Sequence, residues 1–265
     1  MFVDKLNTAW QKNESLVCVG LDPDAHKIPA HIGQERHFYD FCTAIVDATA
    51  DACCAFKPQF AHFAAAGREN ELADLIRYIR TNHPHHVIIL DAKRGDIGST
   101  AAYYAKEAFV RYDADTVTLN PYLGLESIQP FLDYKDRGVT ILCRTSNADS
   151  DWLQNSDEPP IFERVARRVR EWNSTGQCML VTGATYPEEL GRVRTLVADM
   201  PLLVPGIGAQ GGNLAAVLRH GLTESGNGLV ISSSRGILYA GQGVDFAEAA
   251  NTAALQLKAE INTLR

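Results

Sequence analysis

The sequence predicts an α/β fold of the (β/α)8 TIM barrel type, as one domain over residues 1–265. Short apolar runs alternate eight times with segments of helical periodicity, and no linker or low-complexity tract divides the chain. Most runs are apolar at every position, as expected of parallel strands that are covered on both faces. A doubly wound open sheet with extra strands is the alternative.

The elements follow in order along the chain. Apolar spacings of three and four predict helices over Glu71–Ile79 and Phe162–Val169. Pro159-Pro160 and Pro187 suit helix starts, because a proline is tolerated in the first turn. The polar stretch Asn147–Glu158 is the longest expected loop. The runs that we expect to form strands are Leu16–Leu21, Ala52–Phe56, Val87–Leu90, Thr116–Leu119, Thr140–Cys143, Cys178–Val181, Leu202–Val204 and Leu229–Ser232.

The composition fits a protein with a full hydrophobic core. Of the 265 residues, 46% are hydrophobic and 22% are charged, and the formal net charge is -7. This charge argues against nucleic-acid binding, since phosphate backbones are met by clustered Lys and Arg. No apolar run approaches ~18 residues, so we expect no membrane span. The start, Met1–Leu6, does not resemble a secretory signal, and we expect a cytoplasmic protein.

The cysteines and histidines do not indicate a metal site. Six cysteines, at positions 18, 42, 53, 54, 143 and 178, form no C-x-x-C pair. Buried free thiols in a reducing compartment are the better interpretation. His83, His85 and His86 cluster without a carboxylate or cysteine spaced to complete a site, so a solvated loop is expected there.

The run Asp91-Ala-Lys-Arg-Gly-Asp96 carries the strongest chemical signal and follows the third apolar run. In an extended segment, side chains two apart point the same way, so Asp91 and Lys93 should share a face. Asp96, beyond Gly95, can turn back towards them. Nearby carboxylates favour the charged form of a lysine. Such an ammonium group can stabilise a carbanion and then protonate it. For an isolated D-x-K, a surface salt bridge is the simpler interpretation.

Other apolar runs end in polar groups that a barrel would place at the same rim. The first ends at Asp22, which suits either a hydroxyl acceptor or a turn residue. The second is followed by Lys57, which can join the charges of the third run and extend them into a network. The fourth and fifth runs lead into amides and hydroxyls that could read the edge of a heterocycle or simply make turns: Asn120, Thr145, Ser146 and Asn147.

The seventh run leads into a glycine-rich turn, Pro205–Gly212, that contains a formal G-x-G-x-x-G. A dinucleotide fingerprint belongs in the first βα unit, so a turn that offers backbone N–H groups to a phosphate is the better interpretation. The eighth run ends close to Arg235, which adds a cation. Phosphate sites after strands seven and eight recur in barrels, and the sequence therefore predicts a phosphate monoester site.

Together these residues resemble the orotidine 5'-phosphate decarboxylase family, in its longer bacterial, mycobacterial-type branch. Asp91–Thr100 looks like the signature of that family. The resemblance extends in order from Asp22 to Arg235 and covers nearly the whole chain. The supporting segments are Phe56–Gln59, Thr118–Gly124, Arg144–Asn147, Pro205–Gly212 and Ser234–Gly236.

The resemblance implies a (β/α)8 homodimer that uses no cofactor and no metal. Such an enzyme converts orotidine monophosphate to uridine monophosphate and carbon dioxide in pyrimidine synthesis. By this likeness Lys93 is the proton donor, Asp91 lies beside the leaving carboxylate, and Lys57 links the ribose to the charged network. The substrate-binding residues implied are Asp22 for a ribose hydroxyl, Ser146 for the pyrimidine, Gln210 and Arg235 for the phosphate, and Asp96 and Thr100 from the second subunit.

One departure concerns the segment after the fifth run. A Pro-Gly-like turn is expected after Ser146-Asn147, whereas this chain has Ala148-Asp149. The shape of this loop, and the choice between Thr145 and Ser146, therefore stay open.

Three alternatives remain for the activity. A metal-dependent sugar-phosphate decarboxylase of the same barrel superfamily would be sensitive to chelators. A class I aldolase would need a neutral lysine, which neighbouring carboxylates oppose. A non-catalytic nucleotide-binding barrel would leave orotidine monophosphate unchanged.

Overall fold

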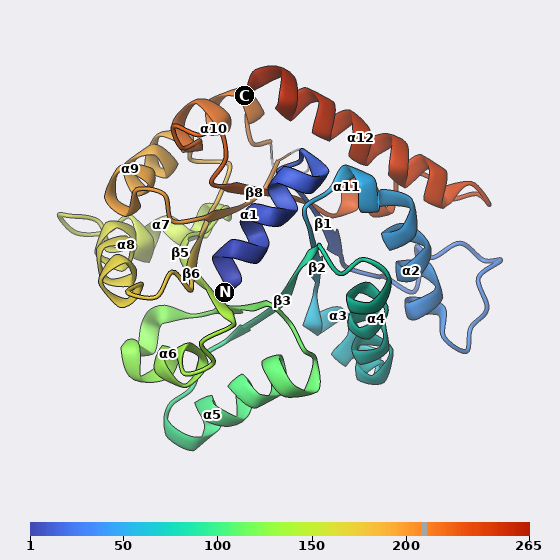
Figure 1. The fold of residues 1–265 in the computed structure, drawn as a ribbon, viewed down its shortest axis with the longest axis horizontal. Coiled ribbons are helices and arrows are strands. Elements are labelled where there is room, and N and C mark those ends of the chain that lie inside the picture. Colours follow the sequence, from blue (N-terminus) through green and yellow to red (C-terminus); the bar gives the residue numbers. More distant parts are fainter. Residues whose placement is uncertain (208–210) are drawn as a thin grey trace.

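A computed structural model describes residues 1–207 and 211–265, and its strands close into one parallel barrel (Figure 1). Strand order follows the sequence, and the first strand pairs with both the second and the last. The predicted (β/α)8 barrel is confirmed, and the open sheet is excluded. The strands are β1 (Val17–Leu21), β2 (Ala55–Pro58), β3 (Val87–Arg94), β4 (Thr116–Leu119), β5 (Gly138–Arg144), β6 (Cys178–Thr182), β7 (Leu202–Pro205) and β8 (Leu229–Ser233).

Each predicted run overlaps one observed strand, and the largest difference is at β2. The expected strand was Ala52–Phe56, but a 3-10 turn, η1 (Ala50–Ala52), occupies its start. Pairing with β1 places Lys57 opposite Gly20, within the strand. β3 likewise runs on through the charged motif to Arg94. Both shifts move catalytic candidates from loops onto the barrel itself.

Helices surround the barrel, and those predicted over residues 71–79 and 162–169 are confirmed as parts of α4 and α8. Pro187 is the first residue of α9. The long loop expected over Asn147–Glu158 is wrong in part, because η4 (Ala148–Ser150) and α7 lie within it. The α-helices are α1 (Phe2–Asn13), α2 (His37–Thr49), α3 (Phe60–Ala65), α4 (Glu69–Asn82), α5 (Gly98–Lys106), α6 (Leu125–Leu132), α7 (Asp151–Gln154), α8 (Ile161–Trp172), α9 (Pro187–Val197), α10 (Leu214–Gly221), α11 (Arg235–Leu238) and α12 (Phe246–Leu264).

The remaining turns are a π-helical turn, η2 (Glu107–Arg111), and a 3-10 turn, η3 (Pro121–Leu123). None of the helices described in the two ranges is long and apolar enough to cross a membrane.

The core occupies both sides of the sheet. Every residue of β1, β2, β4 and β6 is buried, because one face of each strand lines the barrel interior and the other lies under helices. This explains why the strands appear in the sequence as continuous apolar runs rather than as alternating ones.

Helix α1 crosses the N-terminal end of the barrel (Figure 1). The ammonium group of Lys5 lies 2.7 Å from the carboxylate of Asp115, which directly precedes β4. Asn13 donates a hydrogen bond to the carbonyl of Cys53, just before β2. The ring of Phe2 packs directly on Gly138, the first residue of β5. With this end covered, the C-terminal ends of the strands are the open face.

Gly138 provides a test of this packing. A Cβ atom there would lie 2.5 Å from the ring of Phe2, so Gly138→Ala should push α1 from the barrel. We expect a loss of about 1–3 kcal/mol in the free energy of unfolding, measured with urea, because overpacking forces backbone shifts. Gly33→Ala is the matched control, since nothing lies within 4 Å of its added Cβ. Equal stability of the two variants would contradict the packing.

Candidate active site

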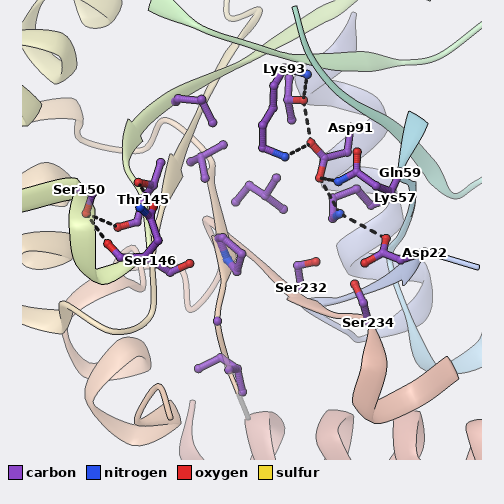
Figure 2. Close-up of a pocket in the computed structure, with 18 of the residues that line it drawn as sticks. Asp22, Lys57, Gln59, Asp91, Lys93, Thr145, Ser146, Ser150, Ser232 and Ser234 are labelled. Atoms are coloured by element: carbon purple, nitrogen blue, oxygen red, sulfur yellow. Dashed lines mark hydrogen bonds and ion pairs between the residues drawn. The ribbon is translucent and has the colours of Figure 1, made fainter. Parts of the chain in front are cut away.

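A pocket of about 750 Å³ opens at the C-terminal ends of the strands. Its lining brings together groups that are far apart in the sequence: Asp22 after β1, Lys57 on β2, Asp91 and Lys93 on β3, Thr118 on β4, Thr145 and Ser146 after β5, and Arg235 after β8. Figure 2 shows the charged groups on one side of the pocket and the hydroxyls of the loop after β5 on the other. The predicted convergence at one rim is thus observed.

The carboxylate of Asp91 is the centre of the charged side. One oxygen accepts hydrogen bonds from Lys57 Nζ at 2.8 Å and from Gln59 Nε2 at 3.0 Å. The other accepts from Lys93 Nζ at 2.7 Å and from Thr118 Oγ1 at 2.9 Å. Asp91 and Lys57 are buried, whereas the side chain of Lys93 is 49% exposed and reaches the open part of the pocket. Lys93 is therefore the cation that a bound molecule can meet.

Each charged group of this network stabilises the ionised form of its neighbour. Burial alone would raise the pKa of Asp91, but the ammonium groups of Lys57 and Lys93 outweigh it and hold that pKa well below 3.8. Burial alone would lower the pKa of Lys57, but the carboxylates of Asp91 and Asp22 outweigh it and raise that pKa above 10.5. Asp91 and Lys57 thus stay ionised across the physiological range.

Thr118 is a member of the network that sequence reasoning did not single out. Its hydroxyl oxygen accepts hydrogen bonds from the backbone N–H groups of Ala92 and Lys93, at 3.0 and 2.9 Å. Lys93 has a φ of 45°, and the register of β3 against β4 shifts between Leu90 and Arg94. The bulge re-aims the lysine. Thr118 stabilises this strained backbone, which simple alternation along a strand does not predict.

Asp22 lies beside the network with one oxygen unused. Its Oδ1 is 3.9 Å from Lys57 Nζ, is buried, and has no hydrogen-bond partner among the described residues. A buried acceptor without a donor is costly, so this atom is suited to receive a hydroxyl from a bound molecule. The interpretation of Asp22 as a hydroxyl acceptor is favoured over that of a turn residue.

The opposite wall distinguishes Thr145 from Ser146. The hydroxyl of Thr145 is engaged by the side chains of Asn147 at 2.7 Å and Gln154 at 2.9 Å. The carbonyl of Ser146 accepts a hydrogen bond from Thr185, while the hydroxyl of Ser146 makes none within residues 1–207 and 211–265. Ser146 is therefore the better candidate to contact a ligand.

The phosphate end of the pocket is described in part. Pro205, Gly206 and Ile207 line it, and Arg235 lines it from the start of α11. Within the described part of the chain, Arg235 forms no ion pair. Gln210, predicted to bind the phosphate, lies outside the described residues.

Three predicted site residues are not brought into this pocket. Asp96 does not line the pocket, the ion pair of Lys93 is with Asp91, and the carboxylate of Asp96 accepts the backbone N–H of Ile97, so the expectation that Asp96 turns back towards Lys93 within the chain is wrong. Thr100 is exposed on α5. The side chain of Asn120 caps η3 by accepting the N–H of Tyr122, as turn chemistry allows. In the part of the chain that the structure describes, no group of three or more His, Cys, Asp or Glu residues could hold a metal ion.

The lowered pKa of Asp91 has a consequence for stability. A carboxylate with a lower pKa in the folded state contributes stability that is complete above its unfolded value, here 3.8, and is lost as the pH falls through the folded value. Asp91→Asn leaves Lys57 buried without this partner and should lower the free energy of unfolding by about 3 kcal/mol.

The measurement is urea unfolding of both proteins over a pH series. The difference should be constant between about pH 5 and pH 8 and should shrink below about pH 4. A difference that grows on acidification would show that Asp91 is not held ionised.

Comparisons with known proteins agree with this geometry. A sequence model described as Orotidine 5'-phosphate decarboxylase / HUMPS family matches residues 15–250. The orotidine 5'-phosphate decarboxylase of Dechloromonas aromatica (strain RCB) is 57% identical, with 100% of this chain and 99% of the relative covered. That of Azoarcus sp. (strain BH72) is 56% identical with the same coverage. The structure of Leishmania donovani OMP decarboxylase superposes with a TM-score of 0.87 at 37% identity, covering 99% of this chain and 98% of that one. Fold, pocket and sequence agree, and the chain belongs to the orotidine 5'-phosphate decarboxylase / HUMPS family.

Proposed function

We propose that this chain converts orotidine 5'-monophosphate to uridine 5'-monophosphate and carbon dioxide, with Lys93 as the acid. The activity follows from relatives of that name at 57% and 56% identity along the whole chain. The observation that carries the role of Lys93 is its ammonium group, bound to Asp91 at 2.7 Å and half exposed to the pocket. The reaction belongs to pyrimidine biosynthesis.

The chemical step breaks the bond between C6 of the pyrimidine and its carboxylate. Carbon dioxide leaves and the electron pair stays on C6, which the ring delocalises poorly. A fixed ammonium group beside C6 stabilises this charge without solvent reorganisation during the step. Lys93 then gives a proton to C6 and is reprotonated from water. Asp91 repels the substrate carboxylate, and this repulsion is relieved when neutral carbon dioxide leaves.

The remaining groups suit the other parts of the nucleotide. A pocket of about 750 Å³ is within the range of small-molecule sites. The unused oxygen of Asp22 and the ammonium group of Lys57 suit ribose hydroxyls, and the hydroxyl of Ser146 suits the edge of the base. Arg235, together with Gln210, is assigned to the phosphate. Binding energy from the phosphate can then support the geometry at C6.

The alternatives are less well supported. The relatives at more than half identity are named for orotidine 5'-phosphate, not for a sugar phosphate. The raised pKa of Lys57 is the opposite of what a Schiff-base lysine needs. A silent nucleotide-binding barrel would not need the charged network.

The six cysteines are buried free thiols, which supports a cytoplasmic location.

A spectrophotometric assay with orotidine 5'-monophosphate tests the function. The wild-type chain should consume the substrate equally with and without a chelator. Lys93→Ala should lower kcat by about a thousandfold or more, because both charge stabilisation and proton donation are lost, while uridine 5'-monophosphate still binds. Lys12→Ala, on α1 at the far end of the barrel, is the matched control.

Two outcomes would contradict the proposal. Undiminished turnover by Lys93→Ala would remove the lysine from the reaction. Loss of activity with the chelator would favour the metal-dependent sugar-phosphate decarboxylase.

We also propose that the active form is a homodimer that shares its sites. In one chain Lys93 has a single carboxylate partner within the described residues, Asp91, while Asp96 and Thr100 stay outside the pocket. Exposed apolar side chains lie on or next to α5, on α6, which packs beside α5, and on η3, which packs against α6: Ile97, Tyr103, Tyr122, Leu123 and Leu125. Such a patch is typical of an interface, and a second copy would bring its Asp96 to Lys93.

Mixing of inactive variants tests the shared site. In a hybrid of Lys93→Ala and Asp96→Ala chains, one of the two sites receives an intact Lys93 and an intact Asp96. Statistical mixing should recover about a quarter of the wild-type activity. A mixture of Lys93→Ala and Lys57→Ala is the control, because both lysines belong to one chain's site and no intact site can form. No recovery in the first mixture, or a monomer in sedimentation, would refute the proposal.

A further inference from the structure

Arg144 is the largest side chain that is fully buried, and it does not line the pocket. It is the last residue of β5, and its guanidinium group lies between two segments. On one side it donates to Ser150, Asp151 and Gln154 of the segment after β5. On the other side it donates to Glu189 of α9 and lies 3.7 Å from the centre of the ring of Tyr186. The side chain therefore connects the pocket loop to the outer ring of helices.

The loop that Arg144 holds forms the wall of the pocket opposite the charged network (Figure 2). Hydrogen bonds within this loop are made by the same residues that accept hydrogen bonds from the guanidinium group, Ser150 and Gln154. Ser150 donates to the carbonyl of Asn147 at 2.6 Å, and Gln154 accepts the backbone N–H of Thr145 at 2.8 Å. Thr145, Ser146, Asn147, Ser150, Trp152 and Gln154 all line the pocket. The position of this wall is thus set from behind by one buried cation.

Ser146 is confined by the strand next to β5 as well. A Cβ atom on Gly183, just after β6, would lie 2.7 Å from Ser146 Cα, so only glycine permits this approach. The N–H of Gly183 donates to the carbonyl of Arg144 at 2.7 Å. Thr185 donates to the carbonyl of Ser146 at 3.1 Å. The backbone of Ser146 is fixed at its carbonyl, which leaves its hydroxyl to face the pocket.

Only arginine suits this position. The guanidinium is a planar group with five N–H donors, and here the donors are distributed over two carboxylates, an amide and a hydroxyl, with an aromatic ring against its face. A lysine has one point of charge and three donors, so it cannot hold the loop and α9 at once.

We propose that Arg144 is a positioning residue for recognition of the pyrimidine. It holds residues 145–154 so that the hydroxyl of Ser146 meets the base, without touching the substrate itself. The inference rests on the proposed role of Ser146. A consequence is that its loss affects the base end of the pocket and not the phosphate end, because Gly206 follows β7 and Arg235 begins α11, after β8.

The test compares binding of two probes, uridine 5'-monophosphate and ribose 5-phosphate, by titration calorimetry. Arg144→Lys should weaken binding of the nucleotide about tenfold or more and raise KM for orotidine 5'-monophosphate, since small misplacements of a binding group are costly. Binding of ribose 5-phosphate should change less than about twofold. Arg235→Ala is the reciprocal variant and should weaken binding of both probes.

Arg194→Lys is the matched control for loss of a partly buried guanidinium that donates several hydrogen bonds. Arg194 donates to the carbonyls of Met200, Gly221 and Gly228 at 2.7–2.9 Å, before β7 and β8 at the opposite end of the barrel. It should lower stability without changing the ratio of the two affinities. Glu189→Gln keeps Arg144 and gives it a weaker partner. It should change the ratio of the two affinities in the same direction as Arg144→Lys, by a smaller factor. This variant replaces Arg144→Lys in the test if Arg144→Lys does not fold.

Equal weakening of both probes in Arg144→Lys and Glu189→Gln, or no effect on the nucleotide, would overturn the proposal. Ser146→Ala separates the premise from the inference. If Ser146→Ala does not change nucleotide affinity, the assigned role of Ser146 is wrong. Because binding is measured without turnover, failure of the wild-type chain to decarboxylate orotidine 5'-monophosphate would be a distinct result.

Discussion

The carboxylate of Asp91 accepts hydrogen bonds from three adjacent strands, and the geometry of the pocket depends on it. It separates two ammonium groups, Lys57 and Lys93, that would otherwise repel each other, and it fixes each with one oxygen. A buried ion pair is stable only when its remaining hydrogen-bonding capacity is satisfied. Gln59 and Thr118 satisfy it here. The ammonium group of Lys93, which we propose as the acid, is therefore held in place without a ligand, as electrostatic catalysis requires.

The two ends of the barrel differ: the N-terminal end is closed by packing, and the C-terminal end carries the pocket. The N-terminal end is covered by α1, and the ion pair of Lys5 with Asp115 holds this helix to the strands. The C-terminal end stays open and collects polar groups from strand ends and loops. On the charged side the groups are on strands, which fixes them firmly. On the other side the contact groups are on a loop, and a second buried charge, Arg144, donates hydrogen bonds to Ser150, Asp151 and Gln154 of that loop.

Much of the fold could be predicted because parallel strands covered on both faces leave a continuous apolar run. All eight runs correspond to strands. The error at β2 arose because Cys53 and Cys54 are as apolar as the residues after them, and only pairing with β1 decides where the strand starts. Asp22, Lys57, Asp91, Lys93, Ser146 and Arg235 could be predicted to meet because parallel strands end at one rim. From the sequence, Asn120 could not be excluded from the site, since an amide next to a proline can either cap a turn or bind a ligand.

By itself the sequence determined the type of barrel, the chemistry at each strand end and the family, because these depend on local patterns and on residue type. The tertiary structure decided which groups touch. Thr118 joins Asp91 only through the register of β3 against β4, and the bulge at Lys93 follows from the same register. Arg144 contacts Glu189, 45 residues further along the chain, because β5 and α9 are brought together by the closed barrel. Such contacts depend on register and closure, which no local pattern specifies.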